Sequence, residues 1–322
     1  MARISINMFK KSISVLSFLL FPFLANAQEG NSVFHFLELP FSAHAAALGG
    51  ENISIIEDDI TMAIHNPALL SYAADKTLNF NYMSYIDGVN VGSAAFSRLA
   101  GARSSWAIAA QYIGYGDMKE TTEEDIELGT FSAKDMAISG IYTYDLSDYW
   151  SGGVKTNLIY SEYEKYNSFA IGVDLGLNYY NDERSFSFSL VARNLGGQIV
   201  AFEDKHEKLP INVQAGISKT LSHAPFRFSA TFHRLNKWGG GVNGKLMNHL
   251  AFGIDYMPTN NFYISLGYNF KRADEMKIAD SSHWAGFSGG AGIQIKRFKL
   301  GAAYAKYHTT SSSLLFNLAI VL

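Results

Sequence analysis

The sequence has no cysteine, only 6 prolines among 322 residues, and a charged fraction of just 17%. Without cysteine the chain can form neither a disulfide nor a Cys-ligated zinc site, and it has no thiolate nucleophile. Beyond residue 27 it also lacks an apolar run long enough to be a transmembrane helix. If the mature chain lies in a membrane, it must cross as a barrel, because only a closed sheet satisfies its own backbone groups there.

The first 27 residues have the features of a secretion signal. Basic residues near the start precede an apolar run at 13–23, and Ala25-Asn26-Ala27 fits the small-x-small cleavage rule. The apolar run is too short to serve comfortably as a membrane anchor. We therefore expect a mature chain that begins at Gln28 and carries a net charge of −6, which gives no support for nucleic-acid binding.

Aromatic residues are abundant, with 18 tyrosines and 23 phenylalanines, and from Lys76 onward apolar residues recur at every second position. Between Ile171 and Tyr179, for example, apolar side chains alternate with Gly, Asp, Gly and Asn. Any half-buried antiparallel strand has one apolar row. Here the second row is small or polar almost throughout, whereas a soluble sandwich of this size would also contain fully buried strands. Apolar-out, polar-in alternation is typical of a transmembrane barrel.

About fourteen segments have this pattern, many with the nine to eleven residues of a tilted membrane-spanning strand. They lie near 76–85, 89–99, 103–114, 134–145, 150–162, 168–180, 185–195, 210–221, 226–235, 246–257, 261–270, 286–296, 298–307 and 311–322. The sequence thus predicts three parts: a signal peptide at 1–27, a periplasmic or plug segment at 28–75, and an outer-membrane barrel at 76–322.

The connections between these segments alternate between tight turns and mostly longer loops. The longest loops are expected at 115–133, 196–209, 236–245 and 271–285. Short periplasmic turns and long outer loops are the asymmetry of an outer-membrane barrel, and an even number of strands puts both termini on the short-turn side. The predicted fold class is therefore all-β, a transmembrane antiparallel barrel of about 14 strands with a short N-terminal helical plug.

The plug is expected at residues 42–73, the only stretch of the mature sequence without a strand pattern. Ser42 can cap a short helix, because its hydroxyl can accept a hydrogen bond from an early N–H group. Gly49 and Gly50 can end that helix through left-handed backbone. His44 lies within the same short helix.

Further signals divide the second half of this stretch. Asp58 or Asp59 can start a helical turn, which Pro67 cannot continue because it lacks an N–H group. Pro67 suits the first position of a new helix, with Asn66 as its cap and Ala68 following. Such short helices are unstable alone in water. They need a surface to pack on, either the inside of a barrel or, as a lid, a soluble β domain.

Motifs for catalysis are incomplete. Residues 239–246 approach a P-loop, but Leu246 stands where Ser or Thr must hold magnesium, and a strand pattern follows. No lysine has a serine three residues before it, and no H-E-x-x-H occurs. The sequence predicts no enzyme activity, no cofactor and no metal.

The long loops carry side chains that can meet a partner. An acidic loop can bind a basic partner or a divalent ion, although a solvated loop is the better explanation of such a cluster. Aromatic side chains inside a polar rim suit protein recognition, and tryptophans near the membrane edge also belong to aromatic girdles. The candidate partner contacts are Glu123, Glu124, Asp125, Lys205, Trp238 and Trp284.

The order of these features resembles the FadL-like outer-membrane proteins. Gly49-Gly50 comes first, Asn66-Pro67-Ala68 follows, and an aromatic fourteen-strand pattern completes the chain. The stretch 192–196, Ala-Arg-Asn-Leu-Gly, is similar to one common at a strand end among them. Within that group the chain most resembles the PorQ-like family of type IX secretion systems, over essentially the whole mature sequence. One departure is His44, where the family pattern has Arg.

The resemblance implies an outer-membrane protein of a Bacteroidota-type cell, in contact with outer-membrane lipid and lipopolysaccharide. It further implies a surface attachment complex that contains a PorZ-like surface protein and a PorU/PorV-like complex and anchors secreted cargo to lipopolysaccharide. The expected function is therefore a non-enzymatic scaffold with no nucleic-acid partner. The alternative is a FadL-like transporter of hydrophobic small molecules, which would share the same fold.

Overall fold

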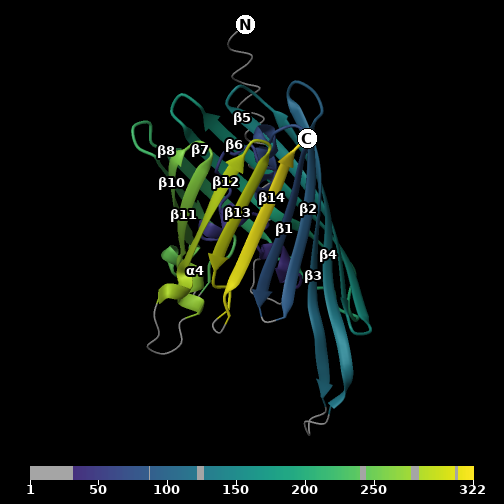
Figure 1. The fold of residues 1–322 in the computed structure, drawn as a ribbon. Helices are drawn as coiled ribbons and strands as arrows, with labels where there is room; N and C mark the ends of the chain where they lie inside the picture. The colour runs from purple at the N-terminus through teal and green to yellow at the C-terminus, as the bar shows by residue number, and fades with distance from the viewer. Residues whose placement is uncertain (1–31, 87, 122–126, 240–243, 277–282, 309–310) are drawn as a thin grey trace. The chain divides into compact units, whose positions relative to one another are not determined.

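The computed structural model describes residues 32–86, 88–121, 127–239, 244–276, 283–308 and 311–322. Fourteen antiparallel strands form a closed barrel, in which each strand pairs with its sequence neighbours and β14 pairs with β1 (Figure 1). The strands are β1 (Thr77–Ile86), β2 (Val89–Leu99), β3 (Ser104–Thr121), β4 (Glu127–Asp145), β5 (Trp150–Tyr163), β6 (Tyr166–Asn181), β7 (Phe186–Val200), β8 (Asn212–Thr220), β9 (Phe226–Phe232), β10 (Leu250–Thr259), β11 (Phe262–Asn269), β12 (Phe287–Ile295), β13 (Phe298–Ala305) and β14 (Ser313–Val321).

The predicted alternation of side chains is confirmed around the barrel wall. On β1, Phe80 and Tyr82 face outward and are about half exposed, whereas Asn79 and Asn81 face the lumen and are buried. The other strands repeat this arrangement, with large apolar side chains outside and Ser, Asn, Asp or small residues inside. Soluble proteins rarely expose so much contiguous apolar surface. The outer face is therefore matched to lipid, as in transmembrane barrels.

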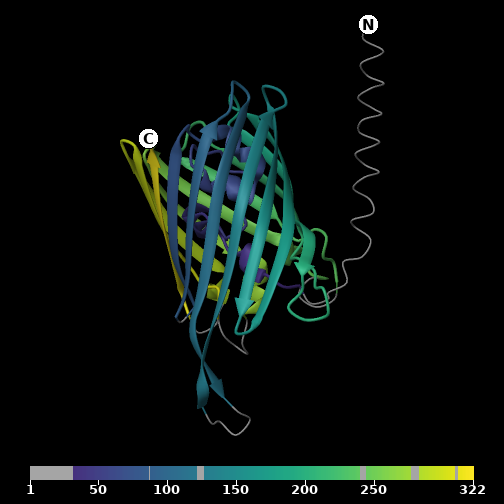
Figure 2. The same ribbon diagram turned by 90° about the vertical axis from the view of Figure 1, so that its right-hand side faces the viewer.

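The helices are short and lie between or before the strands. The described ones are η2 (His35–Glu38), α2 (Ala43–Ala47), α3 (Thr61–His65), η3 (Pro67–Tyr72), η5 (Leu246–His249), α4 (Phe270–Glu275) and η6 (His283–Gly286). Within the described residues, none is long and apolar enough to cross a membrane. Figure 2 shows the segment before β1, in purple, enclosed by the strands.

The number of strands is confirmed, but the predicted loop at 115–133 is wrong. β3 pairs with β2 only as far as Gly114, and β4 pairs with β5 only from Ala133. Beyond those positions β3 and β4 continue as a hairpin that pairs only with itself. Figure 2 shows this hairpin projecting past the end of the barrel.

The two ends of the barrel differ in the length of their connections, as the alternation of tight turns and longer loops in the sequence predicted. Figure 1 shows the carboxyl terminus and the tight turns at one end, and α4 with the β3–β4 hairpin at the other. We call these the short-turn end and the long-loop end. The predicted loops at 196–209 and 271–285 are partly structured, because β7 continues to Val200 and the second contains α4 and η6.

Candidate functional site

Residues 42–73, which we call the plug, fill the lumen. Many plug side chains are buried, and Ile53, Ile55, Ile60 and Leu70 are completely inaccessible to solvent. The helix α2 packs against β11–β14, whereas η3 packs against β3–β6. Because these strands lie on opposite walls, the plug spans the interior of the barrel.

The first half of the plug has the predicted local structure. Ser42 Oγ accepts a hydrogen bond from the backbone N–H of Ala45 at 3.2 Å, so Ser42 is the N-cap of α2. Gly49 and Gly50 follow the helix with φ angles of 96° and 90°. A side chain is strained in this left-handed region, which explains the need for glycine at both positions.

The cap of η3 is also as predicted. Asn66 Oδ1 accepts a hydrogen bond from the N–H of Ala68 at 3.1 Å, and Pro67 takes the first helical position. The Asn66 amide donates its own hydrogen bond to the carbonyl oxygen of Ile53 at 2.9 Å. Asn66 therefore ties the two halves of the plug together as well as capping a helix.

Glycines in the wall let the plug backbone approach it directly. A β-carbon on Gly176 would lie 2.2 Å from Asn66 Oδ1, and one on Gly153 would lie 2.4 Å from the backbone of Pro67. On the opposite wall, a β-carbon on Gly267 would lie 2.3 Å from a plug backbone nitrogen. These distances are far below van der Waals contact, so each glycine is required by the seated plug.

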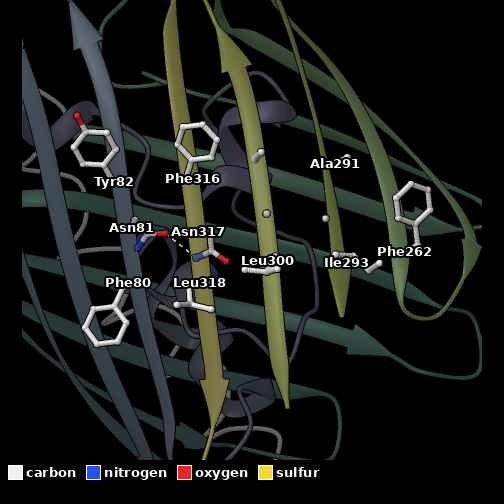
Figure 3. A pocket seen from close by; sticks show the side chains of 13 residues that line it. Phe80, Asn81, Tyr82, Phe262, Ala291, Ile293, Leu300, Phe316, Asn317 and Leu318 are labelled. Atoms are coloured by element: carbon white, nitrogen blue, oxygen red, sulfur yellow. Dashed lines mark hydrogen bonds between the residues drawn. The ribbon is translucent and has the colours of Figure 1, made fainter. Parts of the chain in front are cut away.

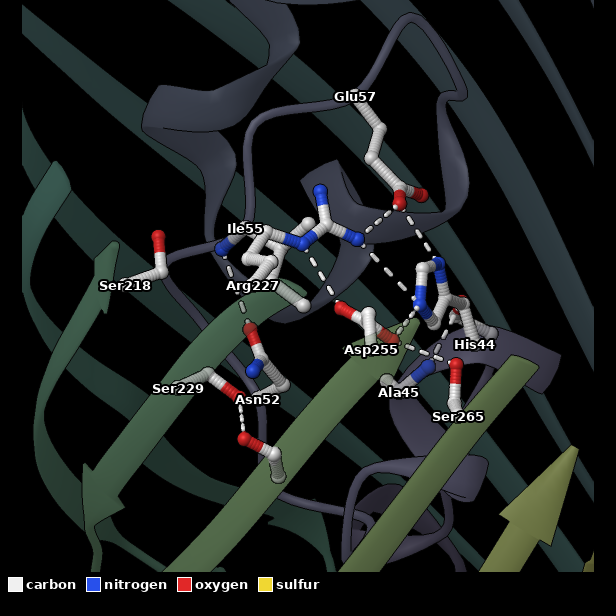
Figure 4. A network of polar contacts seen from close by, with 12 residues as sticks. His44, Ala45, Asn52, Ile55, Glu57, Ser218, Arg227, Ser229, Asp255 and Ser265 are labelled. Atoms are coloured by element: carbon white, nitrogen blue, oxygen red, sulfur yellow. Dashed lines mark hydrogen bonds and ion pairs between the residues drawn. The ribbon is translucent and has the colours of Figure 1, made fainter. Parts of the chain in front are cut away.

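Two plug residues and two wall residues form a buried ion-pair network (Figure 4). His44 Nε2 lies 2.8 Å from Asp255 Oδ1, and His44 Nδ1 lies 2.6 Å from Glu57 Oε1. Arg227 donates from Nε to Asp255 at 2.8 Å and from Nη2 to Glu57 at 3.0 Å. The ring of Tyr263 stacks on His44 with the centroids 3.9 Å apart. Each carboxylate contacts both cations, and the plug is thereby bound to β9 and β10.

The charges in this network stabilise one another. Burial alone would lower the pKa of His44, but the carboxylates of Glu57 and Asp255 outweigh burial and raise that pKa to about 9. Burial alone would raise the pKa of Glu57, but His44 and Arg227 lower it to about 2. His44 and Glu57 are therefore both charged at neutral pH.

A second buried ion pair holds the other side of the plug. Lys155 Nζ lies 2.6 Å from Asp174 Oδ2, and both side chains are almost completely buried. The same ammonium group donates a hydrogen bond to the carbonyl oxygen of Ile64 at 2.8 Å. A cation at this position satisfies a carbonyl group in the last turn of α3 and connects that helix to β5.

Sequence reasoning missed these wall residues, although a signal for them exists. Arg227 lies between two outward phenylalanines, and Lys155, Asp174 and Asp255 also occupy inward positions of apolar strands. Ionisable residues at membrane depth are rare and usually paired. His44, the departure from the family pattern, retains two carboxylate partners.

The two adjacent aspartates of the plug have different roles. Asp58 is half exposed and forms an ion pair with Lys299. Asp59 is buried, and its Oδ1 accepts a hydrogen bond from the N–H of Thr61 at 2.9 Å. Burial raises the pKa of Asp59 to about 6. The helix has Ile60 as its N-cap, one residue after the later of the two predicted starts, Asp58 and Asp59. Both aspartates line a cavity of about 610 Å³ near the short-turn end.

A second hollow lies on the outer face of the wall (Figure 3). It has a volume of about 600 Å³ and is bordered by the rings of Phe80, Tyr82 and Phe316. The outward residues Ala291 and Ala302, which pair across β12 and β13, bring only methyl groups to its floor. In a bilayer this apolar groove would face lipid.

The predicted partner contacts come from separate connections at the long-loop end. Lys205, between β7 and β8, is exposed. Trp238 is 54% exposed and stacks on His249, whereas Trp284 of η6 is 72% exposed. Residues 123–125, the acidic Glu123, Glu124 and Asp125, lie outside the described residues. The structure does not gather these candidates into one site.

Comparison with known proteins identifies the fold only. No protein-family model and no curated protein matches the chain. The Pseudomonas putida toluene transporter TodX has a TM-score of 0.57 at 11% identity, covering 88% of this chain and 97% of that one. The Ralstonia pickettii toluene transporter TbuX has the same score and coverage at 12% identity.

A Pseudomonas aeruginosa FadL homologue is also similar, with a TM-score of 0.53 at 10% identity over 86% of this chain and 97% of that one. The chain therefore has the closed 14-strand fold of these FadL-like barrels. These neighbours are named as transporters or by family, and none as an enzyme.

Proposed function

We propose that the protein is a non-enzymatic, plugged outer-membrane barrel that holds a protein partner at the cell surface. The observation that carries the proposal is the fixation of the plug. The carboxylates of Glu57 and Asp255 each pair with both His44 and Arg227, which binds the plug to the wall. Removing one member of a buried ion pair typically costs about 3–5 kcal/mol. A plug held by such contacts is suited to seal the lumen and give its loops a rigid support.

The long-loop end provides surfaces for a partner. The β3–β4 hairpin extends beyond the barrel, so its outer edges have no strand neighbour from Gly114 and Ala133 onward. Exposed indoles at Trp238 and Trp284 add large side chains of the kind that anchor protein interfaces.

The resemblance to the PorQ-like family supports a specific cellular setting for this proposal. In that setting the partner is a PorZ-like surface protein. The barrel and a PorU/PorV-like complex then act together to attach secreted cargo to lipopolysaccharide in a Bacteroidota-type outer membrane.

Transport of hydrophobic small molecules is the second candidate. The fold comparisons favour it over a secretion anchor, because TodX and TbuX are named as toluene transporters. The apolar groove beside Phe80 and Phe316 would also accept an apolar compound. We rank transport second because fold likeness at such low identity does not carry function, and because the plug is fixed by buried charges.

Trimming the long connections separates the two functions. We expect shortening of one or more of 115–133, 196–209, 236–245 and 271–285 to release the PorZ-like protein from cells while the barrel still assembles. Assembly is checked by the difference in gel migration between heated and unheated samples. If all four connections can be shortened together without release, and proteoliposomes take up toluene, the transporter replaces the scaffold.

A further inference from the structure

The first described residues of the chain are attached at the long-loop end. The backbone N–H of Val33 donates to the carbonyl oxygen of Lys208 at 3.1 Å, and Ser32 pairs with Lys208 in a parallel bridge. Lys208 also bridges to Gly197 in the extension of β7. The chain therefore adds a short strand beside the β7–β8 connection. We call residues 32–39 the amino-terminal strap.

Side chains of the strap anchor it over the outer mouth of the lumen. The rings of Phe34 and Phe202 lie 6.0 Å apart, and Arg193 Nη2 donates to the carbonyl oxygen of Leu37 at 3.0 Å. Phe36 is buried in the same apolar cluster. Together with Ser32 and Val33, five of the strap's eight residues are thus fixed to the barrel or to its β7–β8 connection.

Among residues 32–39, only His35 is exposed. The side chain of His35 is 62% exposed and pairs with Glu38 at 2.9 Å. Burial would raise the pKa of Glu38, but the His35 hydrogen bond and the charges of Arg234 and Lys237 lower it to about 2. Arg234 and Lys237 belong to the β9–β10 connection. The strap therefore lies between two long connections at this end.

The remaining course of the chain fixes the direction of entry. From the strap the plug crosses the lumen to Asp58, which pairs with Lys299 at the short-turn end of β13. The first strand then starts at Thr77, at that same end. The chain consequently enters the lumen from the long-loop side, opposite to the carboxyl terminus.

We propose that the amino-terminal strap is displayed at the cell surface and forms, with residues 201–208, the face that docks the surface partner. This inference rests on the proposed scaffold function. Glu203, Asp204, Lys205 and Lys208 are exposed and mixed in sign. An anionic lipid surface would require a basic excess, whereas a polar surface of mixed charge fits a folded protein.

The absence of cysteine allows a clean test of the topology. His35→Cys, Lys205→Cys and Asp148→Cys place single thiols at the strap, at the β7–β8 connection and at a tight turn. A membrane-impermeant maleimide should label the first two on intact cells and the third only after permeabilisation. Labelling of His35→Cys only after permeabilisation would overturn the inference.

The docking face is tested with the same thiols. A bulky polyethylene glycol maleimide attached at His35→Cys or Lys205→Cys should release at least half of the PorZ-like protein from cells. The same adduct at Lys165→Cys, an exposed residue of the short β5–β6 turn at the long-loop end, should leave it bound. Retention despite an adduct at His35 contradicts the inference. The scaffold function itself is tested separately by deleting the barrel. If the deletion releases the partner but an adduct at His35 does not, the scaffold function stands and only the docking face is wrong.

Discussion

At the scale of single residues, Arg227 is one of the two cations that neutralise the buried carboxylates of the plug network. Its removal leaves Asp255, which is fully buried, and Glu57 with only His44 as a cation. We predict that Arg227→Ala lowers the free energy of unfolding by about 3 kcal/mol, the lower part of the range for a broken buried pair. Urea unfolding in detergent measures the change.

The matched control is another cation on a barrel strand. Lys134 pairs with Glu162 at 3.1 Å, but both side chains are more than one-third exposed. Solvent screens such pairs, so Lys134→Ala should leave the unfolding midpoint close to that of the wild type. If Arg227→Ala and Lys134→Ala lower the free energy of unfolding by the same amount, burial of the plug network does not strengthen its ion pairs.

Gly176 tests the close contact between the wall and the plug. A β-carbon there would overlap Asn66 Oδ1, so Gly176→Ala must displace the cap of η3 or the strand itself. We expect a loss of about 1–3 kcal/mol, as for other overpacked cores. Gly92→Ala is the control, because a β-carbon at Gly92 would meet no atom within 4 Å. An unaltered unfolding midpoint in Gly176→Ala would mean that the plug does not sit against β6.

The pH dependence of stability follows from His44. Its pKa rises from 6.5 to about 9 on folding. A raised pKa contributes stability that is fully present below pH 6.5 and is lost as the pH rises through 9. Glu57 acts oppositely, because its pKa falls from 4.5 to about 2. The stability that Glu57 contributes is present above pH 4.5 and is lost as the pH falls through 2.

We therefore predict that the wild-type unfolding midpoint decreases between pH 6.5 and 9, and that His44→Gln removes most of that slope. Asp59, whose pKa is raised to about 6, adds a loss between pH 3.8 and 6 in both proteins. The comparison above pH 6.5 thus isolates His44 among the groups that face it, namely Glu57, Asp255 and Arg227. A slope that is unchanged in His44→Gln would contradict the charged network.

At the scale of elements, the strands were predictable because lipid imposes a repeated pattern. Each membrane-spanning strand must present an apolar row to lipid, so each of the fourteen strands has an alternating pattern that can be recognised in the sequence. The extension of β3 and β4 beyond Gly114 and Ala133 was not predictable in this way. Those residues lie beyond the part of the wall that faces lipid. Two strands of a hairpin can pair there through their backbones without an apolar row, so the alternating pattern is absent.

The helix caps of the plug could be predicted from the sequence, whereas its ion pairs with the barrel wall could not. Ser42 and Asn66 cap helices through neighbours two or three residues away, which the sequence displays directly. The contact between Glu57 and Arg227 joins residues 170 positions apart. Only the closed barrel brings them together, and no local pattern specifies which inward charges will meet.

The plug as an element should determine conductance. In planar bilayers the intact protein should show little steady current, because residues 42–73 span the lumen between opposite walls. Deleting residues 42–73 should either open large channels or prevent assembly, since the inward row would lose its packing partners. Large, stable pores from the intact protein would contradict a sealed lumen.

At the scale of the whole molecule, the barrel separates two chemically distinct ends. The short-turn end carries the carboxyl terminus and the cavity near Asp58, and the long-loop end carries the hairpin, the exposed indoles and the amino-terminal strap. The plug occupies the lumen between them, which leaves the long-loop end as the part available for a surface function. The scaffold account therefore depends on what that end holds.

The most direct test is the location of the PorZ-like protein in cells that lack this barrel. The account predicts that the PorZ-like protein appears in the culture medium in the deletion strain and returns to the cell surface when the intact barrel is restored. Immunoblots of washed cells and medium measure the distribution. If the PorZ-like protein stays on the surface of cells without the barrel, while uptake of toluene-like compounds falls, the scaffold account is contradicted.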